Sequence, residues 1–322
     1  MVKTFHSALS PYFASFVHEK HACGYRYVAE TAELRRFDRF LSEHACPAGS
    51  LSRSLVEQWT AKRPHNRPRT HRSRVTLIRQ FTRYLCSRGV TAYVLDSNLK
   101  SIVKLDYVPH IYTHQQIRLL FGAVDSLPFD PRTPERQVIM PELFRVLYAC
   151  GLRAGEALRL RFGDVDLDRG VLTIREGKFR KDRLVPMAAP LTIRLRSYAA
   201  RMKFRAAEAV FFPNPKGSSY DLRSIYSLFR RILRNSGIPH GGRGKGPRLH
   251  DLRHTFAVHC LERWYRRGDD LNARLPLLVT YLGHRSLRGT QRYLQLTPAI
   301  FPDINARLES LFHHTTPKKV NS

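Results

Sequence analysis

Apolar residues recur at helical spacing along most of the first third of the chain. The pattern predicts helices over residues 12–19, 28–42, 54–61 and 74–88, and in the second of these Leu34, Phe37 and Leu41 share one face. Proline and a break in the pattern at 106–113 indicate an interdomain connection. We therefore predict an all-helical N-terminal domain (1–107), a linker (108–112), a second domain (113–312) and a disordered tail (313–322).

The second domain combines helical patterns with one short sheet signal. Thr113 and Gln116 have the spacing of a capping box at its first helix. After a proline-rich stretch at 126–134, a helix is expected from 142 to about 150, ending at Gly151. Two β-prone runs, 171–175 and 183–187, flank a basic segment and predict an antiparallel hairpin. Helical patterns follow at 191–203, 220–235 and 250–311, so the expected fold class is mainly α with a small antiparallel β-sheet (α+β).

The charge of the chain indicates a polyanionic partner, with double-stranded DNA as the first candidate. The 322 residues include 55 Lys and Arg against 26 Asp and Glu, a net charge of +29. The segment 62–88 holds nine basic and no acidic residues, although such a run can also be a solvated face without a partner. Candidate phosphate contacts are Lys62, Arg63, Arg67, Arg69, Arg72, Arg74 and Arg79, with Arg243 and Lys245 in the glycine-rich loop at 240–247.

Several function classes are disfavoured by missing patterns. The apolar runs are too short for a membrane span, and the N-terminus lacks a secretory h-region, so a cytoplasmic protein is expected. The five cysteines are scattered without a C-x-x-C pair. His250 and His254 lack the H-E-x-x-H glutamate, and the loop at 241–246 lacks the P-loop order. We therefore expect no metal, nucleotide or other cofactor.

Five short motifs in the second domain carry the candidate chemistry. They are the stretch 149–157 around Arg153, the pair Gly177-Lys178, the box His250-Asp-Leu-Arg-His254, Leu282-Gly-His284, and Thr290-Gln-Arg-Tyr293. Arg153 and Lys178 are separated by 25 residues, His250 and Arg253 by three, and His284 and Tyr293 by nine. In this order and spacing the motifs resemble the tyrosine recombinase (phage integrase) family over about residues 108–310. Residues 1–107 are similar to the family's core-binding domain only in their helical, basic character.

The resemblance implies a DNA strand-exchange site. Arg153 and Arg253 would clamp the scissile phosphate, because planar guanidiniums can each donate two hydrogen bonds to its oxygens. Glu156, three residues after Arg153, would orient it. Tyr293 would be the nucleophile that forms a covalent 3′-phosphotyrosyl link. No metal or nucleotide is then needed, because the phosphotyrosyl link keeps the energy of the broken phosphodiester bond for rejoining.

The resemblance also assigns the proton-transfer groups. Lys178 would protonate the leaving 5′-oxygen, with Lys181 as the rival, since Phe179 stands where the family often has a turn glycine. His250 and His284 would bond to the phosphate or carry the tyrosyl proton, whereas His254 is assigned to packing.

The function implied is site-specific recombination of DNA by a homo- or hetero-tetramer on paired sites, with or without companion recombinases, in a bacterial nucleoid. Extra residues at 125–134 and 264–273 are similar to those of transposon-borne members and favour integration of a mobile element. The alternatives are an inactive DNA-binding accessory subunit and a single-tyrosine topoisomerase. The helical pattern at 300–311 would dock on a neighbouring subunit or on its own core.

Overall fold

The computed structural model describes residues 5–64, 66, 68–96, 108–175, 182–203, 205–242, 246–284 and 293. The chain separates into two compact units, 1–106 and 107–322, which are described individually. The fold is mainly helical with small sheets, so the predicted fold class is confirmed. The tail at 313–322 and the helical pattern at 300–311 lie outside the described residues.

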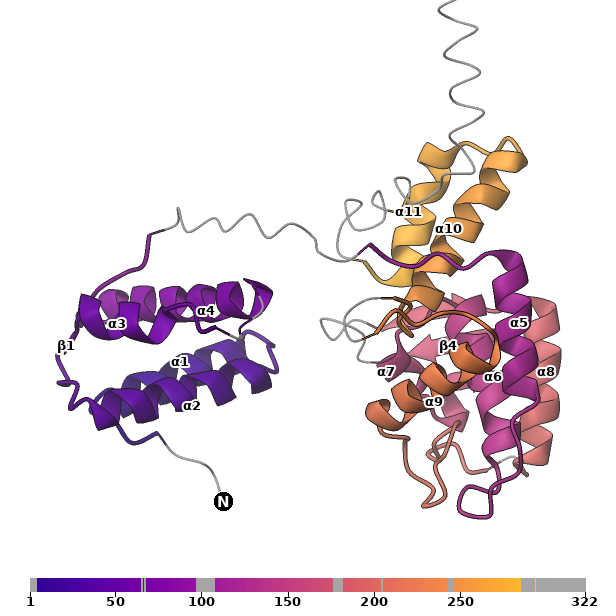
Figure 1. Ribbon diagram of the computed structural model, residues 1–322, viewed down its shortest axis with the longest axis horizontal. Helices are drawn as coiled ribbons and strands as arrows, with labels where there is room; N and C mark the ends of the chain where they lie inside the picture. Colours follow the sequence, from indigo (N-terminus) through magenta and orange to yellow (C-terminus); the bar gives the residue numbers. More distant parts are fainter. Residues whose placement is uncertain are drawn as a thin grey trace, which may run out of the picture. The chain divides into compact units, whose positions relative to one another are not determined.

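The described residues of unit 1 form four helices: α1 (Ser10–Ala22), α2 (Val28–Glu43), α3 (Arg53–Thr60) and α4 (Pro68–Ser87). Figure 1 shows α1 beside α2 and α3 beside α4. Aromatic rings fill the space between them, and Phe13 stacks on Phe81 with ring centroids 4.1 Å apart. The buried Asp38 accepts hydrogen bonds from the amides of His6 and Ser7, which holds the start of the chain on α2.

Two details of unit 1 differ from the prediction. Helix α4 begins at Pro68, six residues earlier than expected, because proline at the first position of a helix loses no intrahelical hydrogen bond. Strands β1 (Ser50–Leu51) and β2 (Thr91–Ala92) form a parallel pair. A two-residue strand is too short to produce an alternating pattern, so the sequence contains no signal for this pair.

Helices α5 (His114–Asp125), α6 (Arg136–Ala149) and α8 (Ala189–Arg201) lie side by side in unit 2 (Figure 1). The predicted capping box at the start of α5 is confirmed: Thr113 Oγ1 accepts from the Gln116 amide, and the Gln116 side chain accepts from the Thr113 amide. Helix α6 begins before the predicted residue 142 because it accommodates Pro141 in its interior. Helix α9 (Leu222–Asn235) contacts α5.

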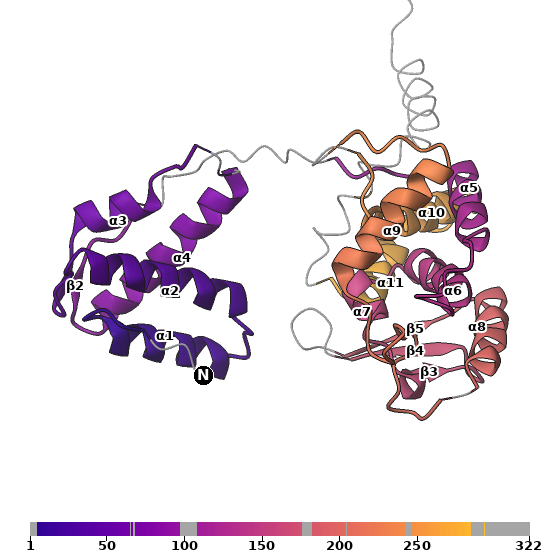
Figure 2. The ribbon, with the colours of Figure 1, turned by 60° about the horizontal axis from the view of Figure 1, so that its bottom comes forward.

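The second sheet consists of β3 (Val165–Asp166), β4 (Val171–Ile174) and β5 (Arg183–Pro186). They lie in the order β3-β4-β5, and each neighbouring pair is antiparallel (Figure 2). The pairing of β4 with β5 confirms the predicted hairpin, whereas the two-residue β3 was not predicted. A short helix, α7 (Ala154–Ala157), and a 3₁₀ turn, η1 (Phe162–Asp164), connect α6 to β3.

Helices α10 (Asp251–Arg266) and α11 (Leu271–Leu282) pack on each other, and α11 also contacts β5. Between them lies a small apolar cluster that includes Leu261, Leu278 and the ring of Tyr293. None of the helices in the described ranges combines the length and apolar character that crossing a membrane requires.

Candidate active site

Two glycines with left-handed backbone conformations frame the candidate site. Gly151 (φ 57°) follows α6, and Gly283 (φ 64°) ends α11. A Cβ on Gly151 would lie 2.5 Å from Phe256 Cδ1, and one on Gly283 would lie 3.1 Å from Arg183 Cδ. The backbone conformation therefore favours glycine at both positions, and at Gly151 a Cβ would also collide with the Phe256 ring.

Arg253 lies on α10 with only 1% of its surface exposed. Its Nη1 donates to the Gly151 carbonyl at 2.7 Å and its Nη2 to the Leu282 carbonyl at 2.5 Å. These bonds use two of the five N–H donors of the guanidinium. Nε is buried and has no hydrogen-bond partner among the described residues. A buried cation with an unsatisfied donor is a favourable place for an anion oxygen.

Arg153 reaches the same helix end from the other side. Its Nη2 donates to the Gly283 carbonyl at 3.2 Å, next in the chain to the carbonyl that Arg253 uses. Its Nη1 bonds to Glu156 Oε1 at 2.6 Å, which agrees with the orienting role expected for Glu156. The predicted arginine pair is thus gathered at the C-terminal end of α11.

Glu156 is shared between two arginines. Besides Arg153, it accepts from Arg183 of β5, whose Nη1 and Nη2 lie 3.1 and 2.8 Å from the two carboxylate oxygens. Burial alone would raise the pKa of Glu156, but the hydrogen bonds and charges of Arg183 and Arg153 outweigh it and lower the pKa to about 2. The charge of Glu156 also acts on Arg253, so the cluster holds three arginines and one carboxylate, and the remaining positive charge favours an anionic ligand.

The histidines and the tyrosine lie beside this arginine cluster. His250 and His254, one turn apart, have perpendicular rings with centroids 4.7 Å apart. His254 Nδ1 lies 3.0 Å from the Tyr293 hydroxyl, and the His284 ring stacks on Tyr293 at 6.1 Å. Sequence analysis assigned His254 to packing, and the structure instead places it in hydrogen-bond contact with the tyrosine hydroxyl.

Burial, followed by the charges of Arg253 and Arg153, lowers the pKa of His250 to about 4. Burial and the nearby Arg153 also lower the pKa of Arg253, to about 10, where it stays charged at neutral pH. The site therefore combines permanent cations with a neutral imidazole at physiological pH.

The structure brings together Arg153, Glu156, His250, Arg253, His284 and Tyr293 of the predicted site. Lys178 and its rival Lys181 lie outside the described residues. Sequence reasoning missed Arg183, which looked like an ordinary strand residue, and the contact of His254 with the Tyr293 hydroxyl. In both cases the neighbour that matters is distant in the chain, so no local pattern marks it.

The predicted DNA contacts of unit 1 divide into exposed and buried residues. Lys62, Arg63, Arg69 and Arg72 are exposed, and Arg79 is half-buried. The expectation for Arg74 is wrong: it is buried, pairs with Glu33 at 2.9 Å and lies over the Trp59 ring, so it joins α4 to α2 instead of facing solvent. Arg67, Arg243 and Lys245 lie outside the described residues.

Helix α9 presents a basic surface that sequence analysis did not single out. Its apolar side chains, such as Leu228 and Ile232, are buried on one side. The opposite side carries the exposed residues Arg223, Arg230, Arg231 and Arg234, none of which forms an ion pair with a described residue. We call these four residues the α9 arginine face.

One cluster has the residue types of a metal site. Ligand atoms of His114, His259 and Glu262 lie within 4.8 Å of one another. However, His259 Nδ1 is already 2.8 Å from the Tyr148 hydroxyl, and the two imidazoles pack on each other with centroids 4.0 Å apart and a tilt of 34° between the rings. Ring packing and the tyrosine hydrogen bond explain this arrangement without a bound ion.

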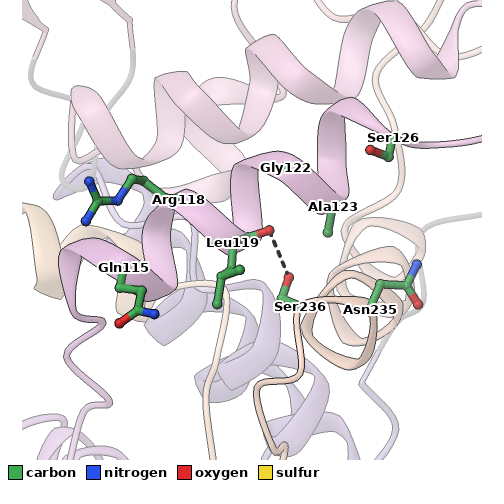
Figure 3. Close-up of a pocket in the computed structure, with 8 residues that line it drawn as sticks. All are labelled: Gln115, Arg118, Leu119, Gly122, Ala123, Ser126, Asn235 and Ser236. Atoms are coloured by element: carbon green, nitrogen blue, oxygen red, sulfur yellow. Dashed lines mark hydrogen bonds between the residues drawn. The ribbon is translucent and has the colours of Figure 1, made fainter.

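A separate hollow lies between α5 and the C-terminal end of α9 (Figure 3). Its wall is made largely of small and polar residues, and the Ser236 hydroxyl donates to the Leu119 carbonyl at 3.4 Å across it. Arg118 is the only charged residue in its lining among the described residues. This hollow lacks the grouping of cations, imidazoles and nucleophile found around Tyr293.

Comparison with known proteins identifies the family of the chain. The model of the phage integrase family matches residues 110–299, more than half of the chain. The chain therefore belongs to the phage integrase family of tyrosine recombinases.

Among its relatives, a putative integrase/recombinase of Sinorhizobium fredii, y4rB, is 32% identical over 98% of this chain and 100% of its own length. The tyrosine recombinase XerD of Pseudomonas putida is 28% identical over 87% of this chain and 89% of its own length.

Solved structures show the same fold. The Tn1549 transposon integrase in complex with transposon right end DNA has a TM-score of 0.64 and 16% identity, covering 89% of this chain and 94% of its own. The XerH recombinase bound to its difH substrate has a TM-score of 0.63 and 19% identity, covering 87% and 79%.

Proposed function

We propose that this protein is a site-specific recombinase that cleaves and rejoins double-stranded DNA through a covalent 3′-phosphotyrosyl intermediate. The observation that carries the proposal is the position of the Tyr293 hydroxyl beside His254 and the buried Arg253, whose Nε is an unsatisfied donor. Attack on a phosphodiester spreads negative charge over the nonbridging oxygens, which the guanidiniums of Arg253 and Arg153 stabilise.

In the cleavage step, Tyr293 Oη bonds to phosphorus and the bond from phosphorus to the 5′-oxygen breaks. Lys178, or Lys181 in its place, donates the proton that the 5′-oxygen needs. A 5′-hydroxyl from the partner strand then attacks the phosphotyrosyl bond and releases the tyrosine. Because the second step reverses the chemistry of the first, the cycle consumes no nucleotide, and the arginines supply the charge stabilisation that a metal ion gives in other phosphoryl-transfer sites.

The exposed basic residues would hold the DNA. Lys62, Arg63, Arg69 and Arg72 of unit 1 and the α9 arginine face of unit 2 are free of ion pairs with described residues. Such side chains release counterions when they neutralise phosphates. Exchange between two duplexes requires a tetramer, with or without companion recombinases, and we place the reaction in the integration of a mobile element.

The test is covalent trapping. A binding site is first selected from a pool of random duplexes, and a nick next to the scissile phosphate then lets the short cleaved product diffuse away. Wild type should form a denaturant-resistant protein–DNA adduct, whereas Tyr293→Phe should bind equally well and form none. An adduct with Tyr293→Phe would refute the assignment, and binding without cleavage by wild type would favour an accessory subunit.

A further inference from the structure

We propose that His254 is a catalytic residue that accepts the proton of the Tyr293 hydroxyl during cleavage and returns it during rejoining. The proposal rests on the proposed function and deepens it. It concerns a step that the arginines and the hairpin lysine leave open, namely how a neutral phenol becomes a nucleophile. With a pKa of about 10 for a free tyrosine, only about one molecule in a thousand is ionised at pH 7.

The geometry is already that of a proton-transfer pair. His254 Nδ1 and Tyr293 Oη are 3.0 Å apart, within the range required of a general base. His254 is held on α10 between Arg253 and the buried Thr255, so a helix and not a loop sets its position. Tyr293 is itself only 3% exposed and packs in the apolar cluster between α10 and α11, which keeps bulk water from serving as the base.

The surrounding charges link this proton transfer to DNA binding. Arg253 and Tyr293 are electrostatically coupled, so the guanidinium stabilises the phenolate. Arg253 and Arg153 place two positive charges in this cluster and help to lower the pKa of His250, so His250, whose ring lies against His254, is neutral and adds no further charge. A scissile phosphate would bring negative charge into the cluster and make an additional positive charge there less costly. The proton should therefore move to His254 chiefly when DNA is bound.

The step balances without any further reactant. In cleavage the O–H bond of Tyr293 breaks, an N–H bond forms on His254, Oη bonds to phosphorus, and the bond to the 5′-oxygen breaks. The proton for that oxygen comes from the separate lysine donor. In rejoining, the 5′-hydroxyl gives its proton back to the lysine and its oxygen bonds to phosphorus, the bond from phosphorus to Oη breaks, and His254 returns its proton to Oη.

The experiment compares single-turnover cleavage of the nicked duplex by wild type, His254→Asn and His254→Ala. Asparagine places an amide near the position of Nδ1, which keeps a hydrogen bond to the tyrosine but removes the base. We expect both variants to cleave at least about 100-fold more slowly, as for loss of a general base. DNA affinity and melting temperature should stay close to those of wild type, and added imidazole should partly restore His254→Ala. His114→Gln, an exposed histidine of the same unit, is the matched control.

Two modified reactants distinguish a general-base role of His254 from a role in packing alone. Replacing the 5′-bridging oxygen by sulfur gives a leaving group that needs no proton, so it should rescue Lys178→Ala but not His254→Asn. A fluorinated tyrosine at position 293 ionises more readily and should reduce the defect of His254→Asn.

Cleavage by His254→Asn within about threefold of wild type, or an equal defect with both tyrosines, would overturn the role of His254 and leave the proposed function standing. If wild type itself forms no adduct, it is the proposed function that fails.

Discussion

Replacing Glu156 by glutamine should strongly destabilise unit 2. The carboxylate is buried and bonded to both Arg153 and Arg183, and their combined effect lowers its pKa from 4.5 to about 2. A tenfold change in the acidity constant corresponds to about 1.4 kcal/mol, so the folded state gains about 3 kcal/mol from this ionised group. Glutamine keeps the shape but leaves the buried guanidiniums without a counter-charge, a loss of about 3–5 kcal/mol.

The pH dependence has a defined sign. Because the pKa is lower in the folded than in the unfolded state, the stabilisation by Glu156 is complete above about pH 5. It is lost as the pH falls towards 2. The difference in free energy of unfolding between wild type and Glu156→Gln should therefore be largest near neutral pH and shrink in acid.

Urea unfolding followed by tryptophan fluorescence measures this effect in unit 2. The chain has two tryptophans, Trp59 in unit 1 and Trp264 in unit 2, so a Trp59→Phe background reports on unit 2 alone. Glu208→Gln is the control, because its pair with Arg161 is largely exposed and should contribute less than about 1 kcal/mol. A loss below about 1 kcal/mol for Glu156→Gln at pH 7 would refute the reasoning.

Three further predictions follow from the same geometry. Gly283→Ala and Gly268→Ala both place alanine at positive φ, so each variant should lose about 1 kcal/mol of stability. Only Gly283→Ala, whose Cβ meets Arg183, should also slow adduct formation about tenfold or more. His250, with its pKa lowered to about 4, should make unfolding easier as the pH falls from 6.5 to 4, by up to about 3 kcal/mol, and His250→Asn should flatten that part of the stability curve. Removing the charges of Arg230 and Arg231 should reduce the slope of log affinity for DNA against log salt by about one to two, whereas Arg194→Gln, whose charge is paired with Glu142, should leave it unchanged. Equal adduct rates for the two glycine variants, a His250→Asn curve parallel to wild type, or equal salt slopes would each count against the corresponding prediction.

Sequence patterns predicted the parts of the fold that depend on neighbouring residues. The helix 28–42 and the Thr113–Gln116 capping box were found because their signals lie within one or a few turns. The two-residue strands were missed because the contacts that form them join distant segments. Pro141 concealed the first turn of α6, since proline in a helix interior is usually unfavourable.

In the site, too, residues marked by a local motif were predicted and residues defined by distant contacts were not. Motif spacing singled out Arg153, Arg253 and Tyr293, and the structure places them close together. It could not identify Arg183, whose importance comes from a carboxylate 27 residues earlier. It also misassigned Arg74, because a charge run does not reveal which member pairs with a half-buried glutamate such as Glu33.

The carbonyls at the C-terminal end of α11 have a consequence for the order of events during DNA binding. Arg253 and Arg153 hold the adjacent carbonyls of Leu282 and Gly283, and His284 comes next in the chain. In the proposed reaction, a phosphate that draws on either guanidinium would compete with one of these carbonyls. Binding of the duplex would thereby be linked to the peptide groups at the end of α11, directly before His284.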